Sequence, residues 1–322
     1  MSAFTNEPTT LQSGTIKSPA NGTTVISVQG FKIAGQQSGK KPARLVGVGG
    51  SGDVKWVYEG NNNGIVWFYD VDPLENGSLL ITGTKPEKTV VSVWNPQTKE
   101  TELSKTFDWD DTHDVDLING DQLLVANMRN YNESTGRNND RLLLYNLSKE
   151  EIIWEWKFKN RGYNESGGGK YADDWTHVND VDKIGEGRYV ASPRNFDQVI
   201  VVNRSTKEVT QQLGADEKHS ILYEQHNPQY LRGENSTPTM LVADSENDRI
   251  VEYAKEEGNW TRTWTLTGNF NWPRDADRLP NGNTLITDTL NHRVVEVTPN
   301  GEVVWEFYAP WGTYDAERMQ LG

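Results

Sequence analysis

Three of the five histidines in this chain, His113, His177 and His226, lie beside a short acidic motif that recurs along the sequence. Two arginines, Arg194 and Arg274, occupy related places. A neutral imidazole can attack an electrophile or bind a metal, and an arginine binds paired oxygens of an anion. A single histidine in such a place is best explained as a strand cap that makes hydrogen bonds. Three of them together with two arginines favour a functional site.

The acidic motif marks an internal repeat. An acidic residue, a small apolar residue and a second acidic residue precede a turn and an apolar strand, and further alternating segments follow, joined by turns such as Pro299-Asn300-Gly301. Four short strands per unit, repeated along the chain, are typical of the blades of a β-propeller. No segment keeps a helical period, so we expect almost no helix. The copies are Asp70–Asp72, Asp114–Asp116, Asp180–Asp182, Asp275–Asp277 and a degenerate one at Gln225–Gln229.

A sixth unit is needed to close the ring, and the two ends of the chain supply it. The C-terminal segment Tyr314–Met319 resembles Arg274–Leu279 and is predicted to form an innermost strand. Pairing it with N-terminal strands removes the exposed edge of an open ring. We therefore predict an all-β, six-bladed β-propeller over residues 20–322, preceded by a flexible segment over residues 1–19. The N-terminal strands of the sixth blade are predicted at Thr23–Gln29, Ala43–Val48 and Asp53–Tyr58.

Aligning the copies predicts which side chains meet. The residue before each first acid lies at the entrance of an inner strand, and inner strands surround the central channel of a propeller. Trp67, Asp111, His177, Glu224 and Trp272 stand two residues earlier, and Arg129 and Arg194 follow the second strands. Two inserts, Asn130–Asn139 and Asn160–Asp174, are predicted to be loops. The residues at the entrances, which we call the hoop, are Tyr69, His113, Asn179, His226, Arg274 and Tyr314.

The neighbours of the histidines argue against a metal. Arg194, Arg274 and Asn179 are hydrogen-bond donors, and fixed cations beside a bound metal ion are unfavourable. Converging donors suit a tetrahedral oxyanion, and a neutral imidazole among them can act as a nucleophile without Ser or Cys. We therefore predict no metal and no cofactor.

Composition excludes several classes of protein. The net charge of −14 argues against binding to nucleic acid or to an anionic membrane surface, and no apolar run is long enough to insert into a membrane. The chain has no cysteine, hence no thiolate chemistry. Its start lacks the pattern of a signal peptide. Sequons nevertheless favour an extracellular or cell-surface glycoprotein; they begin at Asn21, Asn76, Asn132, Asn146, Asn164, Asn203, Asn235 and Asn259.

Four segments together resemble the bacterial and archaeal arylsulfate sulfotransferase family, especially its short archaeal members. The resemblance extends from about Trp67 to the C-terminus. Larger bacterial members carry an additional N-terminal β domain and a disulfide, and this chain has neither. The segments that carry the resemblance are Asp174–Asp182, Ser192–Asn195, Glu224–Gln229 and Trp272–Asp277.

The resemblance implies a six-bladed propeller that moves a sulfuryl group from an aryl sulfate donor to a phenolic acceptor. The family works by a ping-pong mechanism through a sulfohistidine and uses no nucleotide. By motif, His226 is the expected nucleophile. His177, Asn179 and Arg194 would hold the sulfuryl oxygens, and His113 would complete the cradle or act as acid or base. The hoop adds Arg274 and Tyr69 as substrate-binding residues, with Arg129 nearby. Trp67, Trp272 and Tyr314 either face the aryl ring or belong to the blade core.

Two other functions remain open at this stage. The chain could be a non-catalytic surface propeller that binds a glycan or a protein at the same mouth. It could also be a metal-dependent propeller hydrolase of the lactonase or phosphotriesterase kind, because paired acids such as Asp114 and Asp116 could bind a metal. These pairs recur in nearly every blade, which marks them as features of the fold. The physiological donor and acceptor and the oligomeric state are not predicted.

Overall fold

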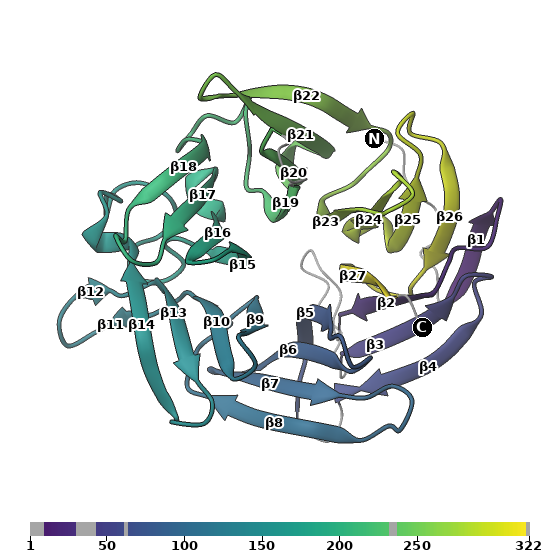
Figure 1. Cartoon of the computed structure of the whole chain (residues 1–322), viewed down its shortest axis with the longest axis horizontal. Coiled ribbons are helices and arrows are strands. Elements are labelled where there is room, and N and C mark those ends of the chain that lie inside the picture. The colour runs from purple at the N-terminus through teal and green to yellow at the C-terminus, as the bar shows by residue number, and fades with distance from the viewer. Residues whose placement is uncertain (1–9, 30–42, 61–63, 232–236, 320–322) are drawn as a thin grey trace.

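Six sheets arranged around a central axis form the molecule (Figure 1). The structure is a computed structural model and describes residues 10–29, 43–60, 64–231 and 237–319. Each sheet runs from an inner strand beside the axis to an outer strand at the rim, and we number the blades from the first inner strand after the N-terminal segment. This is the predicted six-bladed β-propeller. Besides strands, the described residues form only turns and short 3-10 helices.

Blades one to three follow one another along the chain. Blade one consists of β5 (Trp67–Pro73), β6 (Leu79–Lys85), β7 (Lys88–Trp94) and β8 (Thr101–Phe107). Blade two contains β9 (Val115–Ile118), β10 (Gln122–Asn127), β13 (Arg141–Asn146) and β14 (Glu151–Lys157). Blade three contains β15 (Val178–Gly185), β16 (Arg188–Pro193), β17 (Gln198–Asn203) and β18 (Val209–Gly214).

Blades four to six complete the ring. Blade four contains β19 (His226–Leu231), β20 (Thr239–Asp244), β21 (Arg249–Glu256) and β22 (Asn259–Thr267). Blade five contains β23 (Pro273–Arg278), β24 (Thr284–Asp288), β25 (Arg293–Val297) and β26 (Val303–Tyr308). Blade six combines the C-terminal β27 (Thr313–Met319) with the N-terminal β2 (Thr23–Val28), β3 (Arg44–Gly49) and β4 (Val54–Glu59).

The ring is closed in the predicted way. β27 pairs with β2 in antiparallel register, with Ala316 opposite Ile26. The N-terminal strands lie within a residue or two of their predicted bounds. The segment before them contains β1 (Gln12–Ile16), which adds a fifth strand to blade five by pairing with β26. Residues 1–9 of the predicted flexible segment, and the sequon at Asn235, lie outside the described residues.

Tryptophans on outer strands join blades to their neighbours. Trp156 in blade two is fully buried, and its indole N–H donates to the carbonyl of Lys207 in blade three at 2.9 Å. Trp305 in blade five donates in the same way to the carbonyl of Gly50 in blade six at 3.1 Å. Each ring therefore fills the space between two sheets while its one polar atom is satisfied. This explains a core rich in tryptophan.

The acidic pairs join the inner strands. Asp315 of blade six accepts a hydrogen bond from the backbone N–H of Val71 in blade one at 2.8 Å. Asp116 of blade two accepts one from Lys183 in blade three at 3.1 Å. In the degenerate blade four, Gln229 takes the place of an acid and accepts from the N–H of Arg278 at 2.8 Å. The pairs are therefore structural, as their recurrence in nearly every blade indicated.

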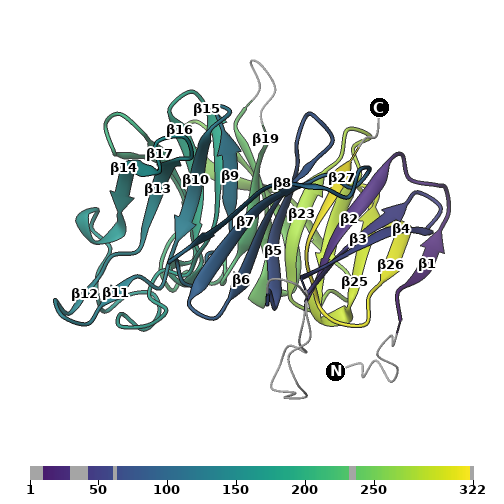
Figure 2. The same cartoon turned by 90° about the horizontal axis from the view of Figure 1, so that it is seen from below.

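The insert Asn130–Asn139 is not entirely loop. It contains a small ribbon of β11 (Tyr131–Asn132) and β12 (Arg137–Asn138), which lies at the lower left of Figure 2. The side chain of Asn138 donates to the carbonyl of Tyr171 at 3.0 Å, so the ribbon contacts the second insert. This second insert, Asn160–Asp174, carries Asp174 into the functional site described next.

Candidate active site

Several residues at the entrances of the inner strands have left-handed backbone conformations. Asp111, His177, Glu224 and Trp272, each two residues before a hoop residue, have φ values of 50°, 43°, 45° and 57°. Non-glycine residues with such conformations are uncommon and concentrate at functional sites. The alternation of side chains along a regular strand therefore does not set the direction of these four side chains. A left-handed turn before each strand places them at the mouth of the channel instead.

The structure brings the predicted residues together around the axis. The rings of Tyr69 and His113 stack with centroids 3.7 Å apart, and those of His113 and His177 lie 4.9 Å apart. The His226 ring lies 6.1 Å from both Tyr314 and Trp272. The imidazole Nε2 atoms of His113, His177 and His226 are all buried without a hydrogen-bond partner. The Nε2 atoms of His177 and His226 are thus open toward the mouth, whereas His113 Nε2 also lies 3.7 Å from Asp111 Oδ2.

The orientation of His226 is fixed by Ser245. His226 Nδ1 lies 2.8 Å from Ser245 Oγ, and that hydroxyl donates its only hydrogen to a carbonyl, with Pro273 O at 2.6 Å. Ser245 can therefore only accept from His226, whose Nδ1 must carry the hydrogen. Burial first, then the charges of Arg274 and Arg194, lower the pKa of His226 well below its usual value. His226 is a neutral imidazole with its lone pair on Nε2.

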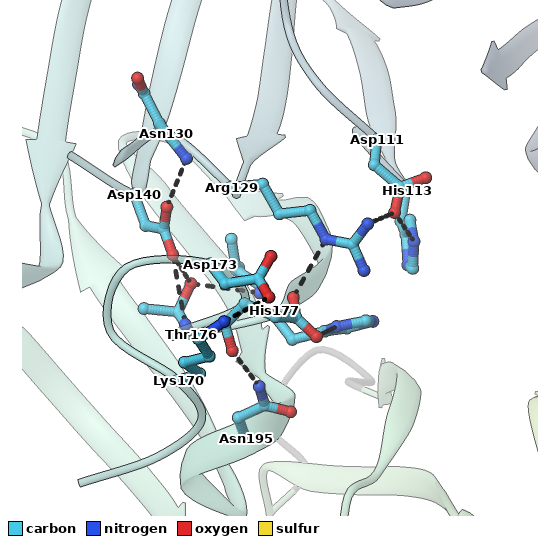
Figure 3. Close-up of polar contacts among 12 residues, drawn as sticks. Asp111, His113, Arg129, Asn130, Asp140, Lys170, Asp173, Thr176, His177 and Asn195 are labelled. Carbon is cyan, nitrogen blue, oxygen red and sulfur yellow. Dashed lines mark hydrogen bonds and ion pairs between the residues drawn. The ribbon is translucent and has the colours of Figure 1, made fainter. Parts of the chain in front are cut away.

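His177 forms a dyad with Asp174, and Figure 3 shows His177 beside Arg129, whose guanidinium points toward Asp111. His177 Nδ1 lies 2.7 Å from Asp174 Oδ2 and donates to it. Burial, with Arg194 beside it, lowers the pKa of His177 to about 3 despite this carboxylate. Burial would raise the pKa of Asp174, but the hydrogen bond to His177 and the charge of Arg129 outweigh it and keep the group ionised. His177 therefore also has its free lone pair on Nε2.

His113 lies between two tyrosines. Tyr314 Oη is 3.0 Å from His113 Nδ1, and Tyr69 Oη donates to Asp111 at 2.8 Å. Burial raises the pKa of Tyr314, so its hydroxyl keeps its hydrogen. Burial lowers the pKa of His113. When Tyr314 donates to Nδ1, the neutral His113 carries its hydrogen on Nε2. His113 is then a donor toward the same space that His177 and His226 face with lone pairs.

The three arginines of the site differ in their partners. Arg129 is bound by two carboxylates, with Nη1 2.7 Å from Asp111 and Nε 3.2 Å from Asp174. Arg194 makes an ion pair with Glu224. Arg274 is buried between aromatic rings, with its guanidinium 3.8 Å from Trp272 and 4.5 Å from Tyr314. Its Nε and Nη1 groups have no hydrogen-bond partner, and burial lowers its pKa to about 10.

Asn179 is also buried at the mouth. Its amide donates one hydrogen to the carbonyl of Gln225 at 3.0 Å, which leaves the second hydrogen of Nδ2 for a ligand. Trp67, the remaining aromatic candidate, stacks on Tyr69 with centroids 4.9 Å apart. Trp272 lies against Arg274, so one face of this tryptophan contacts the cation.

Two cavities meet at the hoop. One, of 430 Å³, opens toward blades one and two and is lined by Trp67, Pro86 and Arg129 among others. The second, of 170 Å³, lies in the channel below and is lined mainly by the acidic pairs. The described residues contain no group of three or more His, Asp or Glu arranged to hold a metal ion. No helix in the described part of the chain is long and apolar enough to cross a membrane.

Sequence reasoning missed Asp174 and Ser245 as residues that orient the histidines. A repeated turn could have revealed Ser245. Arg194, Ser245 and Thr289 each begin a short 3-10 helix that follows the second strand of a blade and ends in a left-handed residue. In two consecutive blades this position contacts a residue of the mouth, Arg194 binding Glu224 and Ser245 binding His226. Asp174 lies in a loop insert, where the repeat gives no register.

Fold and site together define a six-bladed propeller whose mouth gathers histidine, arginine and asparagine side chains. The chain belongs to the arylsulfotransferase (ASST) family, whose model matches residues 20–232. Membership implies a function like that of an arylsulfate sulfotransferase, acting on aryl sulfates. No curated protein sequence matches the chain.

Solved structures with low sequence identity share the fold. A protein of unknown function from Bacteroides caccae has a TM-score of 0.58 at 13% identity, covering 89% of this chain and 93% of its own. A functionally unknown protein from Desulfotomaculum acetoxidans has a TM-score of 0.51 at 11% identity, covering 93% and 81%. Virginiamycin B lyase from Staphylococcus aureus has a TM-score of 0.50 at 11% identity, covering 76% and 70%. These likenesses concern the fold alone.

Proposed function

We propose that the mouth transfers a sulfuryl group from an aryl sulfate to a phenolic or other hydroxyl acceptor, through a sulfohistidine on His226. The observation that carries the proposal is Arg274, a buried cation with unsatisfied N–H groups among three imidazoles. An uncompensated buried charge is destabilising, and an anion bound beside it removes that cost. A sulfate ester supplies such an anion.

In the first half-reaction, the lone pair on His226 Nε2 attacks sulfur and the bond from sulfur to the aryl oxygen breaks. The aryl oxygen leaves with the bonding electron pair as a phenolate. The product on the protein is an N-sulfonated imidazolium whose Nδ1–H stays hydrogen bonded to Ser245. Arg274, Arg194 and Asn179 bind the sulfuryl oxygens, and His113 Nε2–H donates to the departing oxygen. Such preorganised donors stabilise charge that develops in the transition state.

In the second half-reaction, His177 acts as the base. Its free Nε2 takes the proton of the acceptor hydroxyl as the oxygen attacks sulfur, and the bond from sulfur to His226 breaks. His226 returns to its neutral form. Although burial lowers the pKa of His177 in the free protein, Asp174, 2.7 Å from Nδ1, stabilises the imidazolium while the proton is transferred. His177 then releases the proton, which balances the phenolate formed first. The family resemblance had placed His177 among the residues that hold sulfuryl oxygens; its tautomer favours the role of base.

The location of this chemistry is proposed to be extracellular or at the cell surface, on the strength of the sequons. In this mechanism the transfer uses neither a nucleotide nor a metal ion. Small aryl sulfates and phenols would be the partners.

The test is the release of nitrophenolate from 4-nitrophenyl sulfate with phenol as acceptor, comparing the wild type with His226→Ala. We expect release that depends on the acceptor and falls at least about 10⁴-fold in the variant, because loss of a nucleophile removes the covalent route. Mass spectrometry of the wild type without acceptor should detect the added sulfuryl group on His226. Equal release by both proteins would rule out His226 as nucleophile. No release by the wild type across salt and pH would favour a non-catalytic propeller that binds a partner at the mouth.

A further inference from the structure

The larger cavity at the mouth lies on one side of the axis. Its 430 Å³ are enclosed by the entrance of blade one, the hairpin between β6 and β7, and the segments of blade two that carry Asp110 and Arg129. It also reaches Tyr69, His113, His177 and Arg274 near the axis, but His226 does not line it. An anion bound at the hoop therefore has direct access to this cavity.

His226 and the cavity face each other across the ring. His226 begins β19 in blade four, whereas β5 in blade one lies three blades away in either direction, and Figure 1 shows β5 and β19 on opposite sides of the central opening. Displacement at a tetrahedral centre of this kind places the attacking and leaving atoms roughly in line. With His226 attacking from blade four, the leaving oxygen and its aryl group point toward blade one.

The other cavity at the hoop does not suit the aryl group. It is lined by Asp70, Asp114, Asp180 and further carboxyl groups of the acidic pairs. Moving a ring into it would separate many buried carboxyl groups from water or from one another in exchange for few apolar contacts. The cavity in blade one also has charged groups on its wall, but it adds the apolar side chains of Val66, Trp67 and Pro86. The rings of Trp67, Tyr69 and His113 stack along this wall with centroid spacings of 4.9 and 3.7 Å.

The volume of the cavity determines the size of the aryl group that would fill it. An engineered apolar cavity of about 150 Å³ is enough to bind benzene. The cavity in blade one has nearly three times that volume, 430 Å³, and is walled at its outer end by the exposed Pro86 of the β6–β7 turn. A single phenyl ring would leave much of it filled with water.

We infer that this cavity is the aryl subsite, that it receives the leaving phenol and the acceptor phenol in turn, and that it is built for aryl groups of at least two fused rings. The inference rests on the proposed transfer through His226 for its orientation. Since the departing and attacking oxygens both lie opposite His226, one subsite serves both half-reactions.

Sulfonates that cannot be transferred test the subsite on the unmodified protein. Naphthalene-2-sulfonate should bind about tenfold more tightly than benzenesulfonate by titration calorimetry, because its second ring buries additional apolar surface. In Pro86→Trp, the new indole occupies the outer end of the cavity. The naphthalene compound should then lose about tenfold in affinity and benzenesulfonate less than about twofold.

Glu75→Trp is the matched control. Glu75 is exposed in the β5–β6 turn of the same blade, at the end of β5 away from Trp67, so it is expected to leave both affinities unchanged. Equal affinities of the two sulfonates, or equal effects of the two tryptophans, would overturn the assignment. If the size preference appears but wild type never transfers a sulfuryl group, the subsite stands and the proposed chemistry fails. If transfer occurs without a size preference, the proposed chemistry stands and the assignment of the subsite fails.

Discussion

The mouth of the propeller and the channel below it differ sharply, although the same sequence repeat forms both. At the mouth, the hoop positions hold four residue types in six blades, and their buried groups are donors and neutral imidazoles. One and three residues further along each inner strand, most blades carry an acidic pair whose members accept hydrogen bonds from the next blade. A position that stays constant in the repeat joins the blades, and a position that varies forms the site.

The electrostatics of the two regions are opposite in sign. Burial raises the pKa of carboxyl groups such as Asp180 and Asp315, so the channel carries fewer charges than its sequence suggests. At the mouth, burial lowers the pKa values of His226 and Arg274. Each region thus suppresses its own charge, but only the mouth keeps a cation without a carboxylate partner on its Nε and Nη1 groups. That difference predicts which substitutions affect activity and which affect stability.

Among the variants that test this difference between mouth and channel, the largest effect is expected from Arg274→Met, which removes the unpaired cation. The value of kcat/KM for sulfuryl transfer should fall about 10²- to 10³-fold, because a preorganised donor to the developing charge is lost. The melting temperature should stay the same or rise, because burying a cation without a partner destabilises the free protein. Transfer kinetics and thermal unfolding of the same preparations check both expectations.

Arg293→Met provides the control for this contrast. The side chain of Arg293 is 13% exposed and binds Asp288 and Glu306, both at 2.8 Å. Removing it leaves two buried carboxylates without a cation, so stability should fall by about 3–5 kcal/mol while kcat/KM changes little. The comparison fails if Arg274→Met is destabilised as much as Arg293→Met.

A smaller effect is expected from Ser245→Ala, which tests positioning at the mouth. Without the acceptor on Nδ1, the neutral His226 can carry its hydrogen on either nitrogen. The value of kcat should fall about tenfold, while KM changes by less than about twofold, because the tautomer affects reaction more than binding. The ¹⁵N chemical shift of His226 Nε2 should move toward that of a protonated nitrogen, and Ser245→Thr should restore activity.

Thr289→Ala is its matched control. Thr289 begins the equivalent turn one blade later and is equally buried, but its hydroxyl has no hydrogen-bond partner among the described residues. It should leave kcat and the His226 spectrum unchanged. If both alanine variants lose activity alike, the turn itself matters and Ser245 does not act through His226.

Much of the difference between mouth and channel could be predicted from the sequence, for a physical reason. The acidic pairs occupy fixed places in a repeated strand, so alignment alone gave six blades, the closure by β27 and the hoop. The partners of the hoop residues could not be predicted in the same way. Asp174 comes from an insert, and the left-handed turns at His177 and Glu224 break the strand alternation on which a prediction would depend. Whether an arginine is paired, as Arg194 is, or unpaired, as Arg274 is, depends on contacts between blades.

The smallest effect on activity is expected from Asp315→Asn, which changes the channel instead of the mouth. Asp315 has an ordinary pKa of 3.8, raised to about 8 in the fold by burial and by Asp277. A carboxyl group with a raised folded pKa stabilises the fold fully below pH 3.8, and this stabilisation is lost as pH rises toward 8. Asparagine resembles the protonated acid and can still accept from the N–H of Val71. The variant should therefore melt like wild type near pH 4 and a few degrees higher near pH 9.

The measurement is the difference in melting temperature between variant and wild type at several values of pH, with kcat/KM expected to stay within about twofold. Asp108→Asn serves as the control, because Asp108 is 89% exposed and makes an ion pair with Lys88 at the rim. The difference in melting temperature between Asp108→Asn and wild type should not grow with pH. If the difference in melting temperature between Asp315→Asn and wild type also stayed constant with pH, Asp315 would already be ionised in the fold at neutral pH. The channel would then carry the negative charge that its sequence suggests. Mouth and channel would in that case differ by the sign of charges that are present in the fold, not by charges that burial has removed.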